Sequence, residues 1–222
     1  MDNPPALANV ASLFADPTRS EMLLAMMDGR AFPVSELAAM SHVSLPTASH
    51  HLALLVEGGL VEVFQQGRHR YHRLASIQVA ELIEQLGVVS FQVPLQPSKS
   101  QLPLLQGRVC YNHLAGRMGV HLRTSLESSG HILVDQDRYV LTESGLAHFA
   151  SLGFIVEPDL YGKLCLDWTE RVPHIGGRLG QTLFRFFEEK TWIERGPVAR
   201  QICLTKVGKT QLDCHFPGLP NS

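Results

Sequence analysis

Apolar side chains recur at helical spacing through the first third of the chain. An amphipathic helix is predicted near the N-terminus because apolar residues stand at i, i+3, i+4 and i+7: Leu7, Val10, Ala11 and Phe14. Asp16 then provides an N-cap, and Pro17 suits the first position of a second helix that ends at Asp28 and Gly29. We expect its inward side chains to be Leu23, Leu24 and Met27. A short third helix is predicted over residues 34–40.

The stretch VSLPTASHHLALLVEGGL predicts a fourth helix. Residues 41–44 form a tight turn, Ser44 caps the helix with Pro46 in its first turn, and Gly58 with Gly59 ends it. At roughly 100° per residue, one face is apolar and should meet the core: Leu45, Ala48, Leu52 and Leu55. The opposite surface carries Pro46, Thr47, His50 and Ala53, with Ser49 and His51 on its two flanks.

The periodicity changes after this helix. The segment VEVFQQGRHRYHRL has β-branched and aromatic residues on both sides of Gln66-Gly67, which predicts a hairpin with Arg68 and His69 at or near its tip. A further helix, SIQVAELIEQLG, again has apolar residues at i, i+3, i+4 and i+7: Val79, Leu82, Ile83 and Leu86. Helix, helix, turn, helix and hairpin is the order of a winged helix-turn-helix.

A linker and an internal repeat follow. Three prolines in FQVPLQPSKSQLPLLQG argue against regular structure there, so we place a domain boundary between residues 94 and 95. Beyond it, HLAGRMG at 113–119 matches HIGGRLG at 174–180, and LTESG at 141–145 matches LTKVG at 204–208. The predicted fold is mainly α with small β-hairpins (α+β): a winged helix-turn-helix over 1–94, then two similar helix-hairpin, winged-helix-like repeats at about 105–155 and 160–215 within 95–222.

Charge and cysteine content narrow the class of protein. The 222 residues are 45% hydrophobic, enough for a sizeable core, and the net charge of −2 argues against indiscriminate nucleic-acid binding. No membrane-spanning run and no signal peptide is recognised, so a soluble cytoplasmic protein is expected. The four cysteines form no CxxC pair, which indicates neither a disulfide scaffold nor a zinc knuckle. Residues 1–90 carry five Arg and nine acids, yet three of those arginines fall within residues 68–73.

The outward face of the fourth helix is a candidate DNA-binding surface. Short polar groups near its N-terminus, followed by His50, suit insertion into a major groove, and the free amides there suit a phosphate. The hairpin's cationic groups would contact adjacent backbone or minor groove. The predicted DNA-binding residues are Ser44, Pro46, Thr47, Ser49, His50, His51, Arg68, His69 and Arg70. For His51, a half-buried position bonded to backbone is an equal alternative. Adjacent histidines diverge on a helix and chelate poorly, so no metal site is predicted here.

These segments together carry a family resemblance. The stretches LFADPTRSEMLLAM and VSELAAMSHVSLPTASHHLALLVEGGLVEVFQQGRHRYHRL resemble the ArsR/SmtB family of bacterial transcriptional repressors over about residues 5–90. The resemblance implies a homodimer joined by its first and last helices and bound to a pseudo-palindromic operator. The sequence departs from the family's metal sensors: VSELAAM lacks a cysteine pair, and SIQVAELIEQLG lacks histidine and aspartate. A signal would therefore act elsewhere, and the second domain is the candidate.

The second domain offers residues for an effector or redox site: Cys110, Tyr111, His113, Cys165, Asp167, Trp168, Arg171 and His174. It resembles an extension found on a subset of larger ArsR-like regulators, which names no ligand. Cys110 and His113 stand at i, i+3, a spacing that could hold one metal or lower a thiol pKa. Three alternatives stay open: cysteines that only pack as small hydrophobes, a thiol-based redox or electrophile sensor, and a pocket for an organic ligand or metal.

The leading hypothesis is a sequence-specific, homodimeric repressor of double-stranded DNA, released from its operator by a small-molecule, oxidant or other effector. One alternative is a constitutive DNA-binding regulator whose second domain only dimerises or recruits a partner. An enzyme fused to a winged helix is less favoured, because GxGxxG after a strand, GxSxG, HExxH and P-loop motifs are all absent. We predict no cofactor and no membrane partner.

Overall fold

The computed structural model describes residues 4–90, 102–154, 156–157 and 160–217. Packing divides the chain into an N-terminal unit, Met1–Ile83, and a C-terminal unit, Glu84–Ser222. The predicted domain boundary at residues 94 and 95 lies outside the described residues. No helix among the described residues is long and apolar enough to span a membrane.

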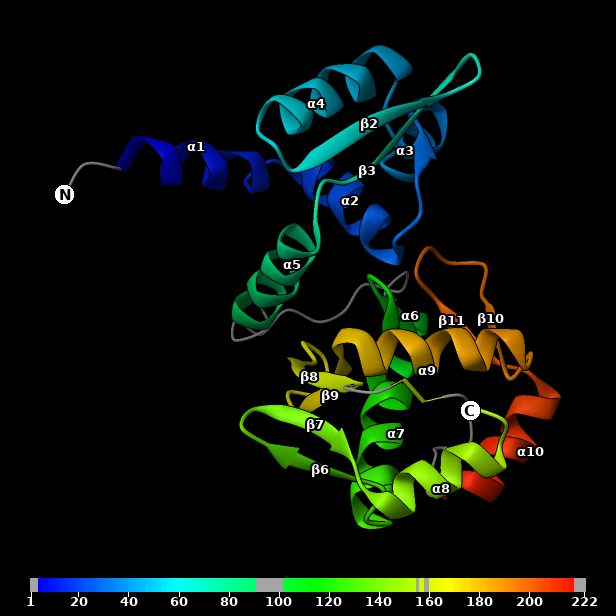
Figure 1. Ribbon diagram of the computed structural model, residues 1–222. Helices are drawn as coiled ribbons and strands as arrows, with labels where there is room; N and C mark the ends of the chain where they lie inside the picture. The colour runs from blue at the N-terminus through cyan, green and yellow to red at the C-terminus, as the bar shows by residue number, and fades with distance from the viewer. Residues whose placement is uncertain (1–3, 91–101, 155, 158–159, 218–222) are drawn as a thin grey trace. The chain divides into compact units, whose positions relative to one another are not determined.

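The N-terminal unit is a winged helix-turn-helix (Figure 1). Its three strands form an antiparallel sheet in the order β1-β3-β2, in which Val61 to Gln66 pair with Leu74 to His69. Its elements are α1 (Pro4–Phe14), α2 (Pro17–Ala25), the 3₁₀ turn η1 (Met26–Asp28), β1 (Phe32–Pro33), α3 (Val34–Met40), α4 (Leu45–Glu57), β2 (Val61–Gln66), β3 (His69–Leu74) and the start of α5 (Ile77–Ser90).

Local sequence signals fix the ends of these helices. The Asp16 carboxylate caps α2 by accepting the Arg19 amide at 2.9 Å, and the Ser44 hydroxyl caps α4 by accepting the Thr47 amide at 3.3 Å. Gly29, with a φ of 73°, ends the turn after α2 in the left-handed region that glycine tolerates. The predicted positions of α2, α3, α4 and the hairpin are confirmed.

Two predicted core residues of this unit are exposed instead. Leu24 is 41% exposed and Leu45 is 52% exposed. Leu24 lies on the side of α2 away from the buried Met22 and Leu23, whose face continues into η1 with Met26 and Met27. Leu45 is the first residue of α4, one turn before Ala48 begins the buried stripe.

The C-terminal unit is α+β (Figure 1). A four-stranded antiparallel sheet has the order β6-β7-β8-β9, and β4-β5 and β10-β11 form two further hairpins. The elements are α6 (Leu102–Gln106), β4 (Arg108–Cys110), β5 (His113–Ala115), α7 (Gly116–Ser128), β6 (Ile132–Asp135), β7 (Arg138–Leu141), α8 (Glu143–Ser151), β8 (Tyr161–Leu166), β9 (Pro173–Gly176), α9 (Gly177–Glu189), β10 (Ile193–Arg195), β11 (Ile202–Leu204) and α10 (Lys206–His215).

The order strand, strand, helix, strand, strand, helix occurs twice from β4 onward. The repeated motif Leu-Thr-x-x-Gly performs the same task in each half: Thr142 caps α8 by accepting the Gly145 amide at 3.0 Å, and Thr205 caps α10 by accepting the Gly208 amide at 2.9 Å. That the two halves are winged-helix-like repeats stays a prediction.

The linker prediction was wrong at one point, because α6 lies within the proline-rich segment. Pro103 is the second residue of α6, and proline is tolerated in the first turn of a helix, where its missing N–H has no partner to lose. One apolar core fills this unit, with aromatic side chains at its centre: Tyr139, Phe149, Phe187, Trp192 and Phe216.

Candidate functional site

The outward face of α4 is the first candidate site. Pro46, Thr47, Ser49, His50 and Ala53 are all exposed, whereas Ala48, Leu52 and Leu55 bury the opposite face. The Ser44 cap also bonds the Thr47 hydroxyl at 2.8 Å, which holds two short polar groups at the start of the helix. The face therefore presents small and polar side chains followed by an imidazole.

The β2–β3 hairpin, hereafter the wing, places cations beside this face. Gly67 and Arg68 form its tip between Gln66 and His69, and Gly67 has a φ of 61°. A groove of about 670 Å³ lies between α4 and the wing, and its lining includes Ser49 and Ala53 of α4 and Arg68, His69 and Arg70 of the wing. The structure thus brings Ser49 together with the three predicted hairpin residues in this groove, whereas the other predicted helix residues do not line it: Ser44, Pro46, Thr47, His50 and His51.

His51 differs from the other predicted contacts. Its side chain is only 15% exposed, and its Nδ1 lies 3.7 Å from the Asp16 carboxylate on α2. The half-buried alternative therefore describes His51, although its partner is a carboxylate rather than backbone. A hydrogen bond from the Arg19 amide holds the pKa of Asp16 below its usual value, so this carboxylate is charged beside the imidazole.

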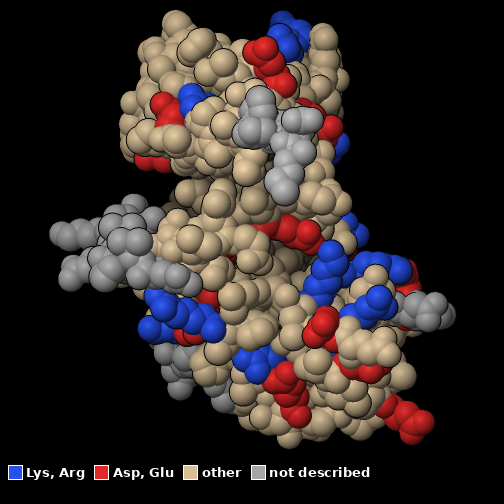
Figure 2. All heavy atoms as spheres, turned by 90° about the vertical axis from the view of Figure 1, so that its left-hand side faces the viewer, with Lys and Arg blue, Asp and Glu red and all other residues tan. Residues whose placement is uncertain are grey.

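Positive charge is local on this protein. On the face shown in Figure 2, basic and acidic side chains lie in small groups, and neither sign covers a continuous area of the coloured surface. In the wing itself, Arg73 pairs with Glu62 and lies over the Phe64 ring at 5.2 Å. Arg68 and Arg70 have no ion-pair partner among the described residues and are exposed.

The second candidate site is buried in the C-terminal unit, where two cysteine–histidine pairs meet. Cys110 on β4 stands directly opposite His113 on β5, and Cys165 on β8 stands directly opposite His174 on β9. Cys110 and His113 are therefore three residues apart because they lie on the two strands of one hairpin. We call these four side chains the Cys–His cluster.

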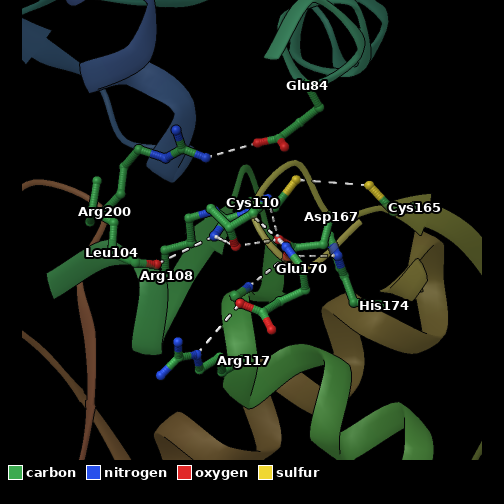
Figure 3. Close-up of polar contacts among 12 residues, drawn as sticks. Glu84, Leu104, Arg108, Cys110, Arg117, Cys165, Asp167, Glu170, His174 and Arg200 are labelled. Atoms are coloured by element: carbon green, nitrogen blue, oxygen red, sulfur yellow. Dashed lines mark hydrogen bonds and ion pairs between the residues drawn. The ribbon is translucent and has the colours of Figure 1, made fainter. Parts of the chain in front are cut away.

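The four side chains converge on one point. The Sγ atoms of Cys110 and Cys165 lie 4.0 Å apart, and the Nε2 atoms of His113 and His174 lie 3.0 Å apart. Figure 3 shows the two sulfurs facing each other. One sulfur or nitrogen atom from each residue lies within 4.8 Å of the other three. Cys110, His113 and His174 are buried and Cys165 is half-buried, so the cluster is largely shielded from water.

Asp167 supports the cluster from behind His174. Its carboxylate is fully buried, lies 3.2 Å from His174 Nδ1 and 2.8 Å from Arg108 Nη2, and accepts the Gly116 amide at 2.7 Å. Although His174 Nδ1 has no hydrogen bond of good geometry, the ion-pair distance is short. The Thr169 side chain and amide add further bonds to the same carboxylate.

These contacts shift the proton affinities of the site. Burial would lower the pKa of His174, but the Asp167 carboxylate outweighs it and raises the pKa to about 9. Burial opposes ionisation of Asp167, yet His174 and Arg108 hold the pKa of its carboxyl well below the usual range. The adjacent Cys165 thiol and burial together raise the pKa of Cys110, so this thiol has no enhanced reactivity as an isolated group.

The other predicted residues of the second domain surround the cluster without joining it. Tyr111 is half-buried in the β4–β5 turn with a φ of 57°. The Trp168 ring lies under the Arg108 guanidinium at 4.6 Å. Arg171 is exposed in the β8–β9 connection, at a φ of 59°.

Sequence reasoning missed several supporting residues. Arg108 is fully buried, and Asn112 Oδ1 lies 3.1 Å from His113 Nδ1. Glu84 pairs with Arg200 at 2.8 Å, and although burial opposes it, the guanidinium lowers the pKa of Glu84. Arg117 and Arg178 pair with Glu170 and Glu157. Asn112 directly precedes His113 in the motif CYNH, and this position was its only local sequence signal as a partner of that histidine.

Comparison with known proteins places this chain among helix-turn-helix regulators. A family model described as "Helix-turn-helix domain" matches residues 14–63. The HTH-type transcriptional regulator YdfF of Bacillus subtilis is 39% identical over 220 residues, covering 96% of this chain and 97% of that protein. The HTH-type transcriptional regulator CmtR of Mycobacterium tuberculosis is 36% identical over 81 residues, 36% of this chain and 68% of that protein.

A solved structure is also similar to part of this chain. It is the homodimeric winged helix-turn-helix DNA-binding domain of a possible ArsR-family transcriptional regulator from Mycobacterium bovis. That chain is 30% identical, and the match covers 42% of this chain and 85% of that one. The TM-score of the match is 0.39.

Proposed function

We propose that this chain, which belongs to the ArsR/SmtB family of HTH-type transcriptional regulators, is a homodimeric repressor that binds a pseudo-palindromic operator and is released by a signal acting on its C-terminal unit. In this proposal, α4 enters the major groove and the wing contacts the adjacent backbone. Half-sites are then expected about one DNA turn apart.

The cations of the wing carry the DNA-binding part of the proposal. Within the described part of the N-terminal unit, Arg19, Arg30 and Arg73 each lie within ion-pair distance of an aspartate or glutamate. Arg68 and Arg70 are the two that lack such a partner there, and they line the groove beside α4. An unpaired cation at an exposed hairpin tip gains most from a phosphate, because it gives up no ion pair to bind.

The proposed dimer rests on exposed apolar side chains of α1 and α5. Leu7 on α1 is 74% exposed, and Val89 on α5 is 63% exposed, with Leu82 and Leu86 near 40%. Figure 1 shows α1 extending away from the other helices of the N-terminal unit. Two helices with such uncovered residues suit a second copy of the chain, whose matching helices would remove these side chains from water.

Release from DNA would be a population shift. An effector that binds one dimer conformation more tightly than the other lowers operator affinity by that difference in binding free energy. The C-terminal unit is the proposed place for the effector. It has its own apolar core and a buried polar cluster, and neither has a part in the proposed DNA contacts.

The test is fluorescence anisotropy of the purified, reduced, full-length protein on the DNA upstream of its own gene. Scrambled DNA of equal length is the control, and both are titrated across a salt series. We expect salt-sensitive binding that favours the upstream DNA by several kcal/mol, as specific repressors show. Equal, weak affinity for both DNAs would refute the sequence-specific repressor.

The same assay separates release from constitutive binding. Thiol oxidants, divalent metals and small organic molecules are added in turn to the operator complex. A fall in operator affinity with one of them supports regulated release, whereas unchanged affinity with all would favour a C-terminal unit that only dimerises or recruits a partner.

A further inference from the structure

The Cys–His cluster has the donor set of a four-coordinate metal site, and its sulfur–sulfur and nitrogen–nitrogen distances are close to those of a tetrahedral one. Bond lengths of about 2.3 Å to sulfur and about 2.0 Å to nitrogen give a tetrahedron with edges of about 3.8 Å between sulfurs and about 3.3 Å between nitrogens. The corresponding distances are 4.0 Å and 3.0 Å. We propose that the C-terminal unit binds one thiophilic divalent cation, with Zn²⁺ as the first choice, through Cys110, His113, Cys165 and His174.

Both imidazoles are oriented as metal ligands are. The Nε2 atoms of His113 and His174 face each other within the cluster, while their Nδ1 atoms lie 3.1 Å from the Asn112 amide oxygen and 3.2 Å from the Asp167 carboxylate. An oxygen acceptor close to Nδ1 favours the proton there and leaves the Nε2 lone pair for a cation. For His174 this contact is an ion-pair distance without hydrogen-bond geometry. Such outer partners are typical of metal-bound histidines, and each histidine here has its own.

The two halves of the unit contribute equivalent ligands. In each half, a cysteine and a histidine stand directly opposite each other on a hairpin, and the histidine begins the repeated H-x-x-G-R-x-G motif. The backbone leaves room for them: a Cβ at Gly176 would lie 3.0 Å from Cys165 Cβ and 3.3 Å from His113 Nε2. A Cβ at Gly180 would lie 2.1 Å from the Ile175 carbonyl oxygen and 3.1 Å from His113 Cβ. Glycine thus permits the close approach of the two pairs.

Charge also balances. Cation binding breaks two S–H bonds, forms two metal–thiolate bonds and releases the thiol protons, together with any proton on an imidazole Nε2, to solvent. Two thiolates then neutralise a divalent cation, and the nearby buried ions are already paired as Arg108–Asp167 and Arg200–Glu84. No uncompensated charge is buried, which is the condition for a stable interior site. Four ligands from the chain leave no open position, so the cation would be structural.

A redox pair is the competing assignment for the same sulfurs. A disulfide needs the Sγ atoms about 2.05 Å apart, so the 4.0 Å separation must shorten by about half. A tetrahedral cation needs a change of only about 0.2 Å in that distance. A disulfide would engage only the two sulfurs and leave the imidazoles to the hydrogen bond between their Nε2 atoms, whereas a cation engages all four side chains.

Cobalt titration tests the site directly. The full-length protein is stripped with a chelator in oxygen-free reducing buffer and titrated with Co²⁺, which gives intense visible bands in tetrahedral sites and a near-ultraviolet band with thiolate ligands. We expect one Co²⁺ per chain, both sets of bands, and displacement by one equivalent of Zn²⁺. Cys110→Ser and Cys165→Ser should each remove about half of the thiolate band. Cys214→Ser is the matched control, because Cys214 is exposed and outside the cluster.

A second variant keeps the test informative if the cysteine variants do not fold. Asn112→Ala keeps both thiols and removes only the outer partner of His113, so Co²⁺ affinity should fall about 10- to 100-fold with the thiolate band retained. The metal site is disproved if folded wild type, checked by tryptophan fluorescence, binds Co²⁺ without tetrahedral and thiolate bands. It is equally disproved if Cys214→Ser removes the thiolate band and both cluster variants keep it. The inference does not depend on repression, so these outcomes leave the DNA-binding proposal unaffected.

Discussion

Replacing the two wing arginines together, Arg68→Ala with Arg70→Ala, should change the salt dependence of operator binding in a calculable way. Each phosphate contact contributes about −0.9 to the slope of log K against log salt. Two unpaired cations per wing and two wings per dimer make four contacts, so the slope should become less negative by about 3.6. Between 50 and 200 mM salt, the loss of affinity should then shrink by about 150-fold.

The assay is fluorescence anisotropy at four or more salt concentrations on the operator and on scrambled DNA. Phosphate contacts are independent of sequence, so both DNAs should show the same change in slope. Arg185→Ala is the matched control. Arg185 is exposed on α9 in the C-terminal unit, so its loss removes one positive charge without touching α4 or the wing.

Three results would refute parts of this reasoning. An unchanged slope in the double variant would show that the wing does not contact phosphates, and the proposed docking would be wrong. A change near 1.8 instead of 3.6 would mean that one wing binds per complex, which contradicts a symmetric dimer on two half-sites. A similar change in Arg185→Ala would show that net charge alone governs binding.

Three further changes test other parts of the molecule. His50→Ala should relax sequence preference with little change in salt slope, measured by competition with operators carrying single base changes; a slope change with preference intact would contradict base readout. Leu7→Glu should weaken the proposed dimer, measured by analytical ultracentrifugation, with the exposed Leu133→Glu in β6 as control. Asp16→Ala should destabilise α2 by about 1 kcal/mol, and Asp16→Asn, which keeps a capping oxygen, by less. Because folding lowers the pKa of Asp16, the stability difference between wild type and each variant should be present at neutral pH and shrink as the pH falls below the usual carboxyl range. Urea unfolding followed by circular dichroism measures it.

The N-terminal unit was predictable because its signals are local. Caps at Asp16 and Ser44, a left-handed glycine at Gly29 and alternation around Gly67 each act within a few residues of the structure they specify. The errors arose where tertiary packing selects among apolar positions. At Leu24, helical spacing alone could not tell which of two adjacent leucines faces the core.

The Cys–His cluster was less accessible from sequence. Its residues were recognised as candidates, but Cys110 and His113 are three residues apart whereas Cys165 and His174 are nine apart, because the second hairpin has a longer connection. The equivalence of the pairs therefore depends on strand register. The buried Arg108 carries no sequence signal, since an isolated arginine is normally exposed.

The buried Arg108–Asp167 pair offers a stability test of the C-terminal unit. Arg108→Met leaves the fully buried Asp167 without its guanidinium partner, and breaking such a pair costs about 3–5 kcal/mol. Arg117→Met is the matched control, because Arg117 is 47% exposed and its pair with Glu170, at 3.6 Å, is worth at most about 1 kcal/mol.

Tryptophan fluorescence reports this unit selectively, because both tryptophans of the chain, Trp168 and Trp192, lie in it. In urea unfolding of the full-length protein, the transition of Arg108→Met should move to lower urea by an amount several times that of Arg117→Met. Equal shifts would mean that water or a neighbouring cation compensates Asp167 in the variant. The carboxylate that orients His174 would then not depend on Arg108, and the support assigned to the Cys–His cluster would have to come from the backbone amides of Gly116 and Thr169.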